Sequence, residues 1–412
     1  MEDEFDDYLE DEDDEQDLEL AQVALNRGDN QAALELVEDY LEEHPLDVEA
    51  LNLCAVAAAN LGDDPKALAL YRKALRLDPK NGALHHNYGV LLERLGDLED
   101  ALEHFQRSLA LQPDFPEAYI NMGNTLDELG RTEEAVQMYD QALRRLPDTP
   151  DAYYNKGYAL NRLGRFEEAV ASFEKALVGN SADASSLNGK GYALSALGRD
   201  EEALTCYRRA IARDPGVPTY YFNRGLSLFR REHFTEALSD FDRALELDPE
   251  FYEACIEKIS VLIELERYPE ALKMVAQAAL LAPESPEPAF YRGVVLERLG
   301  DLPGALLALE ESLARDPESI YALNNRGNVL MDLGRLDDAL ACFDDILART
   351  SSYPLAYYNR ACVFALKGKV REAVSALTRA ADQDTHFLED ARHDPDFDPI
   401  REAASFRKLL RR

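Results

Sequence analysis

The sequence contains no tryptophan and little lysine, with 11 lysines against 33 arginines. Basic residues as a whole are outnumbered, since 44 Lys and Arg face 80 Asp and Glu, for a formal net charge of −36. A chain this acidic is repelled by the phosphates of nucleic acids and by anionic membrane surfaces. These deficits argue against a nucleic-acid-binding protein and against a protein that binds anionic membranes.

Long hydrophobic runs and paired cysteines are also missing. No apolar run approaches the roughly 18 residues that a membrane-spanning helix needs. The five cysteines are scattered and form no Cys-X-X-Cys pair, and the acidic start of the chain is the opposite of a secretory signal. An odd, widely spaced set of cysteines is typical of a reducing compartment. We therefore expect a cytoplasmic protein.

The negative charge is distributed unevenly. Residues 1–20 hold 13 acidic side chains and no basic one, while the rest of the chain still carries a balance of −23. Residues 1–13 are expected to form a disordered acidic tail. Such a tail either keeps the protein soluble, or neutralises a basic partner, or competes with ligands for the protein's own binding surface.

A repeat of 34 residues determines the expected fold. It starts at Asp14 and runs through residue 387 in eleven copies without an insertion, and the twentieth place is Ala in all eleven. The eighth and twenty-seventh places are mostly Gly, Ala or Ser, which lets two helices approach closely. Gly at place 15 allows a sharp turn, and Pro at place 32 ends the second helix. Each unit is therefore predicted to be a helix–turn–helix hairpin in an all-α protein.

The pattern resembles the tetratricopeptide repeat over residues 14–387. It departs from that family where a Trp is frequent, with residues such as Tyr119, Tyr153 and Tyr221 instead. The resemblance implies an α-solenoid, a right-handed superhelix whose first helices line a concave groove. Residues 388–412 resemble the tail that often closes bacterial arrays of this kind, so we expect a capping helix there, with Ile400, Ala403, Phe406 and Leu410 at helical spacing.

Residues suited to catalysis or metal binding are not arranged in any known pattern. The seven histidines form no His-Glu-X-X-His motif and no ligand spacing with cysteine. Asp394, Asp396 and Asp398 imitate the start of a calcium loop, but Pro399 and Ser405 stand where such a loop needs Gly and Glu. We expect neither an enzyme nor a protein that needs a cofactor or metal.

The expected groove is rich in asparagine. Place 6 of the repeat is Asn in six copies, and a side-chain amide can both donate to and accept from a peptide backbone. The arrangement resembles the asparagine ladder in the repeats of O-linked N-acetylglucosamine transferases, which grips extended peptides. The alternative is that Asn is merely common at this place. The candidate peptide-binding residues, with neighbouring groove positions included, are Asn87, Asn121, Asn124, Asn155, Tyr158, Tyr192, Asn223, Asn325, Asn328 and Asn359.

Charges near the groove favour one class of ligand. Place 2 is acidic in six repeats and never basic, and place 5 is never Lys, so the clamp that chaperone-tail adaptors use for a terminal carboxylate is missing. We expect a protein-interaction scaffold that binds an extended, neutral or basic segment of a partner. The alternative is a non-catalytic, substrate-recruiting subunit of a glycosyltransferase or another enzyme complex.

The acid-rich, lysine-poor composition predicts a response to salt. It resembles proteins of salt-loving organisms, in which concentrated salt screens the repulsion between acidic side chains. We expect the melting temperature to rise on addition of molar KCl, which thermal melts across a KCl series would measure. A melting temperature that stays flat or falls would contradict this explanation of the charge.

Overall fold

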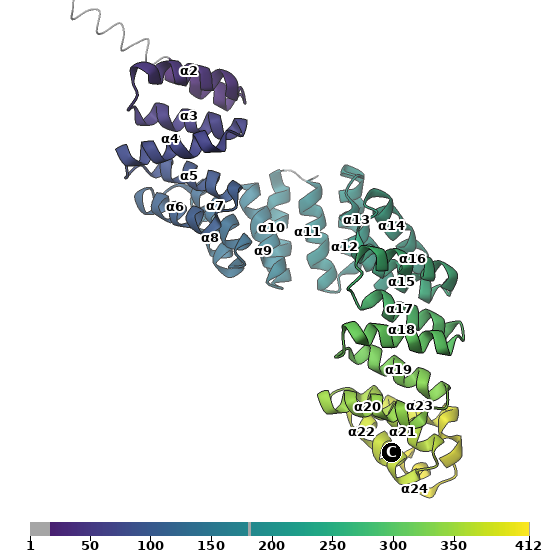
Figure 1. Ribbon diagram of the computed structural model, residues 1–412. Coiled ribbons are helices and arrows are strands. Elements are labelled where there is room, and N and C mark those ends of the chain that lie inside the picture. The colour runs from purple at the N-terminus through teal and green to yellow at the C-terminus, as the bar shows by residue number, and fades with distance from the viewer. Residues whose placement is uncertain (1–16, 180–182, 412) are drawn as a thin grey trace, which may run out of the picture. The chain divides into compact units, whose positions relative to one another are not determined.

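The computed structural model describes residues 17–179 and 183–411, and these residues lie in helices, turns and short connections without any strand (Figure 1). The expected acidic tail, residues 1–13, lies outside the described residues. The chain divides into two compact units, Met1–Pro215 and Gly216–Arg412.

In unit 1, the two helices of each repeat pack against each other, and each pair packs on the next. Residues 17–26 form the first helix of repeat 1. The following helices are α2 (Asn30–Glu43), α3 (Val48–Leu61), α4 (Asp64–Leu77), α5 (Gly82–Leu95), α6 (Leu98–Leu111), α7 (Pro116–Glu128), α8 (Thr132–Arg145), α9 (Pro150–Arg162), α10 (Phe166–Gly179), α11 (Ala184–Ala196) and α12 (Asp200–Arg213).

Unit 2 continues the same pairing through repeat 11. Its paired helices are α13 (Pro218–Arg230), α14 (Phe234–Leu247), α15 (Tyr252–Glu264), α16 (Tyr268–Leu281), α17 (Glu287–Arg298), α18 (Leu302–Arg315), α19 (Ile320–Asp332), α20 (Leu336–Arg349), α21 (Pro354–Leu366) and α22 (Val370–Gln383). The prediction of an all-α solenoid of helix pairs is confirmed by this order of packing.

Small residues occupy the helix crossings, as the repeat predicts. The eleven alanines at place 20 are all completely buried. At place 8, six glycines each face an aromatic ring at place 24 of the same repeat, so closely that an added Cβ would meet the ring; Gly225 would place it 2.8 Å from Phe241. Where place 8 is larger, as at Ile259, place 24 is the smaller Val275. The two places together therefore set the distance between paired helices.

This exchange of size predicts a coupled pair of substitutions. Gly225→Ile alone should lower the free energy of unfolding by about 3 kcal/mol through overpacking, and Phe241→Val alone by about 2 kcal/mol through a cavity. The double variant recreates the Ile259–Val275 pair of repeat 8. Its loss in free energy of unfolding should be smaller than the sum of the two single losses by at least about 1 kcal/mol. Urea unfolding of the four proteins measures the coupling, and strictly additive losses would contradict it.

The turns between paired helices use the left-handed backbone region. All nine glycines at place 15 have positive φ, from 67° at Gly368 to 85° at Gly62 and Gly96. The two repeats that lack this glycine keep the same turn, because Glu232 has φ 61° and Glu266 has φ 56°. A side chain with a Cβ is strained in this region by roughly 1–2 kcal/mol. The turn is therefore imposed by the helix packing even where the residue type opposes it.

Relief of this strain is testable. Glu232→Gly and Glu266→Gly should each raise the free energy of unfolding by about 0.5–1 kcal/mol, since the relieved strain exceeds the added chain entropy. The matched control is Gly300→Glu, which introduces the strain into repeat 9 and should destabilise by a similar amount. Thermal and urea unfolding measure both. A loss of stability in the two glycine variants would show that the turn is not strained.

Ion pairs connect successive repeats on the side of place 7. In four repeats the basic residue at this place bonds to the acid at place 25 of the preceding repeat: Lys156 to Asp140 at 2.6 Å, Lys190 to Glu174 at 2.8 Å, Lys258 to Asp242 at 2.6 Å and Arg360 to Asp344 at 2.9 Å. The lysine side chains are only 18–20% exposed. Salt screens such partly buried pairs less than exposed ones.

The C-terminal residues cover the last repeat. Helix α23 (His386–His393), the 3₁₀ helix η1 (Pro395–Ile400) and α24 (Ala404–Leu409) pack on α21 and α22. Phe397 and Phe406 are fully buried there, with ring centroids 5.3 Å apart. The helical spacing from Ile400 to Leu410 predicts one helix, but Pro399 lies inside η1 and α24 starts only at Ala404.

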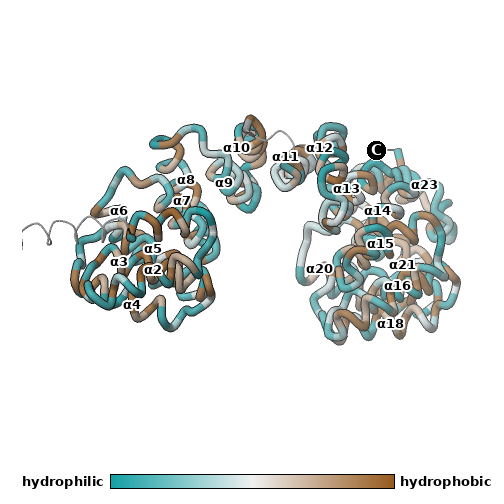
Figure 2. The backbone as a smooth tube through the Cα atoms, turned by 90° about the horizontal axis from the view of Figure 1, so that it is seen from above, coloured by the Kyte–Doolittle hydropathy of each residue, from teal (hydrophilic) through white to brown (hydrophobic). Residues whose placement is uncertain are grey.

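Hydrophobic and hydrophilic stretches alternate along the helices of each unit (Figure 2). In the described part of the chain, no helix is long and apolar enough to cross a membrane. The five cysteines are free and buried inside the array.

Candidate functional site

Hydrogen bonds between repeats are formed by four asparagines at place 6, namely Asn87, Asn121, Asn155 and Asn359. Asn87 Nδ2 donates to Asn52 Oδ1 at 3.0 Å, and Asn155 Nδ2 donates to Asn124 Oδ1 at 2.9 Å. Asn359 Nδ2 donates to Asn324 Oδ1 at 2.9 Å and to Asn328 Oδ1 at 3.0 Å. In each case the acceptor lies at place 5 or place 9 of the preceding repeat. The amides therefore first serve to join and orient neighbouring first helices.

His86 extends this system across three repeats. Asn121 Nδ2 donates to His86 Nε2 at 3.0 Å, and His86 Nδ1 lies 3.2 Å from Asn87 Oδ1. Because Nε2 accepts, the ring is neutral with its proton on Nδ1, which donates to Asn87. Burial lowers the pKa of His86 and so favours this neutral form. The chain of bonds runs from Asn121 through His86 and Asn87 to Asn52.

Two of these amides, Asn121 and Asn155, combine accessibility with a carbonyl oxygen that faces no donor in the part of the chain that the structure describes. Within the described residues, no group donates to Oδ1 of Asn121 or of Asn155, and both side chains are half-buried. A side-chain amide held by its N–H in one orientation presents its oxygen in a defined direction. These two oxygens, in α7 and α9 of unit 1, are acceptors available to a ligand.

Steric contacts and apolar neighbours explain why the ladder of hydrogen bonds between place 6 and the preceding repeat is interrupted in some repeats. At Gly189 an added Cβ would lie 2.4 Å from the ring of Phe173, so only glycine fits at place 6 of repeat 6. Asn325 follows a repeat with Phe290 and Val294 at places 5 and 9, and its Nδ2 turns back to Tyr321 O of its own helix at 3.1 Å.

Two other residue types take place 6 in repeats 8 and 9. Ser260 Oγ lies 3.1 Å from the hydroxyl of Tyr291, which therefore occupies the position of a ladder amide. Glu257 is half-buried, and neither of its neighbours at places 5 and 9 of repeat 7, Phe222 and Leu226, can hydrogen-bond to it. Burial, and then the charge of Glu287, raises the pKa of the Glu257 carboxyl. Repeats 8 and 9 thus carry an acidic and an aromatic group where repeats 3 to 5 carry amides.

The remaining predicted residues differ in accessibility. Tyr158 is half-buried and its hydroxyl donates to Ser185 O at 3.0 Å, so it joins repeats 5 and 6. Tyr192 is 46% exposed, whereas Asn359 is only 8% exposed and offers little surface to a partner. Asn124, Asn223, Asn325 and Asn328 are half-buried. Asn124 also accepts from the Tyr139 hydroxyl at 2.8 Å, which commits its oxygen.

The hydrogen-bond acceptors of the ladder were not predicted from the sequence. Asn52, His86 and Asn324 at place 5 are as much part of it as the asparagines that follow them. The signal was present in the sequence: a polar residue at place 5 or 9 is followed by Asn either 35 or 31 residues later. Because donor and acceptor lie in successive repeats, the residues of one repeat considered alone do not reveal this spacing.

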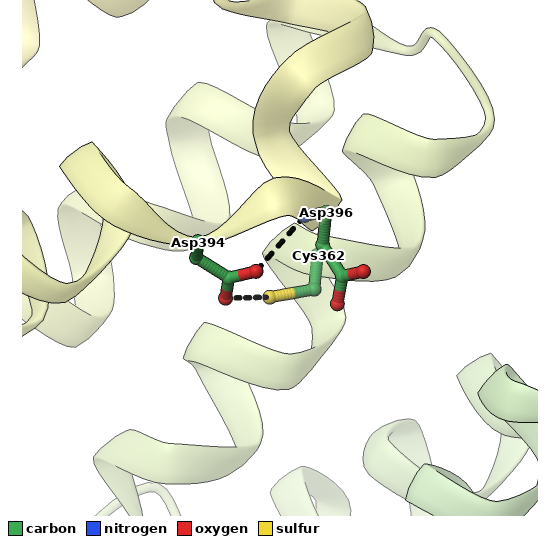
Figure 3. Close-up of side chains that lie close together, drawn as sticks. All are labelled: Cys362, Asp394 and Asp396. Carbon is green, nitrogen blue, oxygen red and sulfur yellow. Dashed lines mark hydrogen bonds between the residues drawn. The ribbon is translucent and has the colours of Figure 1, made fainter.

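Near the C-terminus, Cys362, Asp394 and Asp396 lie close enough to one another to share a metal ion (Figure 3). However, the Asp394 carboxylate already accepts from the Tyr358 hydroxyl at 2.6 Å, from Cys362 Sγ at 3.6 Å and from Asp396 N at 2.9 Å. Burial and the charge of Asp394 raise the pKa of the Cys362 thiol, so it stays protonated. These contacts make Asp394 the N-cap of η1.

Models of the tetratricopeptide repeat match residues 18–82, 120–185, 188–250 and 324–386, and two further models of this repeat match residues 81–148 and 228–289. The chain belongs to the tetratricopeptide repeat family. No curated protein matches the sequence.

Several solved structures are similar to this tetratricopeptide repeat protein. A chain of the APC/C hetero-tetramer Cut9–Hcn1 is 12% identical, with 95% of each chain covered and a TM-score of 0.50. YrrB, described as a TPR protein with an unusual peptide-binding site, is 26% identical over 45% of this chain and 95% of its own, with a TM-score of 0.40. MamA 41-end from Desulfovibrio magneticus RS-1 is 25% identical over 41% and 96%, with a TM-score of 0.40.

Proposed function

We propose that this protein is an interaction scaffold that binds an extended segment of a partner protein along the first helices of its repeats. Family membership supports the general role, since tetratricopeptide repeats bind protein or peptide partners. The observation that carries the specific proposal is the pair of oriented, unused amide oxygens of Asn121 and Asn155. They are suited to accept from the backbone N–H groups of an extended chain, whatever its side chains are.

The charge at place 2 supports a neutral or basic partner segment. Five acids at this place are in the described residues, and none of them forms an ion pair there: Glu49, Glu117, Asp151, Glu253 and Glu287. Unpaired carboxylates repel an acidic segment and attract Lys or Arg. The sixth acid, Glu15, lies outside the described residues.

The ladder can be tested with a triple variant, Asn87, Asn121 and Asn155 each changed to Ala. The loss of three side-chain amides should weaken partner binding by at least about tenfold, since each net hydrogen bond contributes about 1 kcal/mol. Pull-downs with the native protein and the variant, quantified by mass spectrometry, measure the recovery of partners.

A matched control separates binding from folding. Asn52→Ala breaks the bond between Asn52 and Asn87 but leaves Asn87, Asn121 and Asn155 in place, so it should keep partner recovery while losing part of the stability that the triple variant loses. Equal recovery by the native protein and the triple variant, with both folded by circular dichroism, would remove the ladder from the mechanism.

A further inference from the structure

A cavity of about 550 Å³ lies in unit 2 between the N-terminal ends of α17 and α19. Its walls include Glu287, Phe290 and Tyr291 from α17, Ser312 and Asp316 at the end of α18, and Tyr321 from α19. This volume falls within the range of small-molecule and side-chain pockets in proteins. The cavity is therefore large enough for a long side chain together with ordered water.

The cavity combines aromatic rings with negative charge. The rings of Phe290 and Tyr291 meet edge to face, with centroids 5.3 Å apart, and Tyr321 leaves 69% of its surface exposed. No lysine or arginine is among the residues that line it. Aromatic faces attract cations through their quadrupole, and an exposed tyrosine beside a cavity is typical of a binding hot spot.

The two carboxylates of the cavity accept hydrogen bonds, and Asp316 lies close enough to Arg349 for their charges to interact. Glu287 Oε2 accepts from the Tyr252 hydroxyl at 2.8 Å, and Asp316 Oδ1 accepts from Glu318 N at 3.1 Å. Neither forms an ion pair with a residue that the structure describes. Glu257 adds a third carboxyl group close enough to interact with Glu287, and burial, followed by the charge of Glu287, raises its pKa. A bound cation would offset the repulsion between Glu257 and Glu287.

We propose that this cavity binds the side chain of an arginine in the partner segment. The inference rests on the proposed function and deepens it by naming one residue type at one repeat. A guanidinium is flat, stacks on aromatic rings and donates several hydrogen bonds to carboxylates at once, whereas an ammonium is compact and strongly hydrated. The chain itself uses this contact, since the Arg145 guanidinium lies 4.3 Å from the centroid of the Tyr119 ring.

A second cavity provides an internal comparison. In unit 1, Asp151 and Tyr154 occupy the same places 2 and 5 beside a smaller cavity of about 290 Å³. It has one aromatic residue in its wall instead of three. We therefore expect a stronger arginine preference in repeat 9 than in repeat 5, which makes Asp151→Asn a matched control for Glu287→Gln.

The test compares two small probes, Nα-acetyl-arginine amide and Nα-acetyl-citrulline amide. Citrulline has nearly the same shape as arginine but no charge. Titrations followed by ligand-observed NMR should show the arginine probe binding at least about tenfold more tightly than the citrulline probe. Glu287→Gln and Tyr321→Ala should each abolish most of this preference, and Asp151→Asn should retain it.

Equal binding of the two probes, or an unchanged preference in Glu287→Gln, would overturn the inference. Melting temperatures of the variants show whether they are folded, and Tyr321 is exposed enough for its loss to be tolerated. The result is independent of the ladder experiment. If the triple ladder variant loses its partners while the two probes bind equally, the proposed function is supported and the arginine pocket is contradicted. If the variant keeps its partners while the arginine probe binds more tightly, the pocket is supported and the role of the ladder is contradicted.

Discussion

The close approach of paired helices at places 8 and 24 is the constraint on which the rest of the structure depends. A glycine in the first helix allows a large ring from the second helix to pack directly against its backbone, as Gly191 does with Tyr207. Because interiors are packed to near-crystalline density, this contact leaves little freedom in the distance between helices. That distance in turn determines how far the first helices of successive repeats lie from one another.

The hydrogen-bonded ladder is a consequence of this spacing. An amide at place 6 reaches places 5 and 9 of the preceding repeat only if all first helices are separated by about the same distance. One N–H of each amide is then used within the protein, and in Asn121 and Asn155 the oxygen is left for a ligand. Such preorganisation lowers the entropic cost of binding.

Two groups of repeats present different chemistry at the same places. Amides and a neutral histidine follow one another in repeats 2 to 5, whereas Glu257, Tyr291 and the acidic, aromatic cavity follow one another in repeats 8 to 10. The first set suits a peptide backbone and the second suits a cationic side chain. Two of the acids in unit 2, Glu287 and Asp316, line the proposed arginine pocket. The partly buried lysine pairs, by contrast, hold repeats together.

Local physics made the fold predictable from the sequence alone. The helix ends follow from Gly and Pro within each 34-residue unit, and Glu232 and Glu266, the two exceptions at place 15, adopt the left-handed turn of the other nine repeats. The asparagines of the candidate site were also identifiable by their place in the repeat. Their hydrogen-bond partners, the reason for Gly189, the division of the C-terminal segment at Pro399 and the aromatic cavity were decided only by the tertiary structure. These features depend on side chains that packing brings together from different helices. The spacing of residues within one repeat does not predict such contacts.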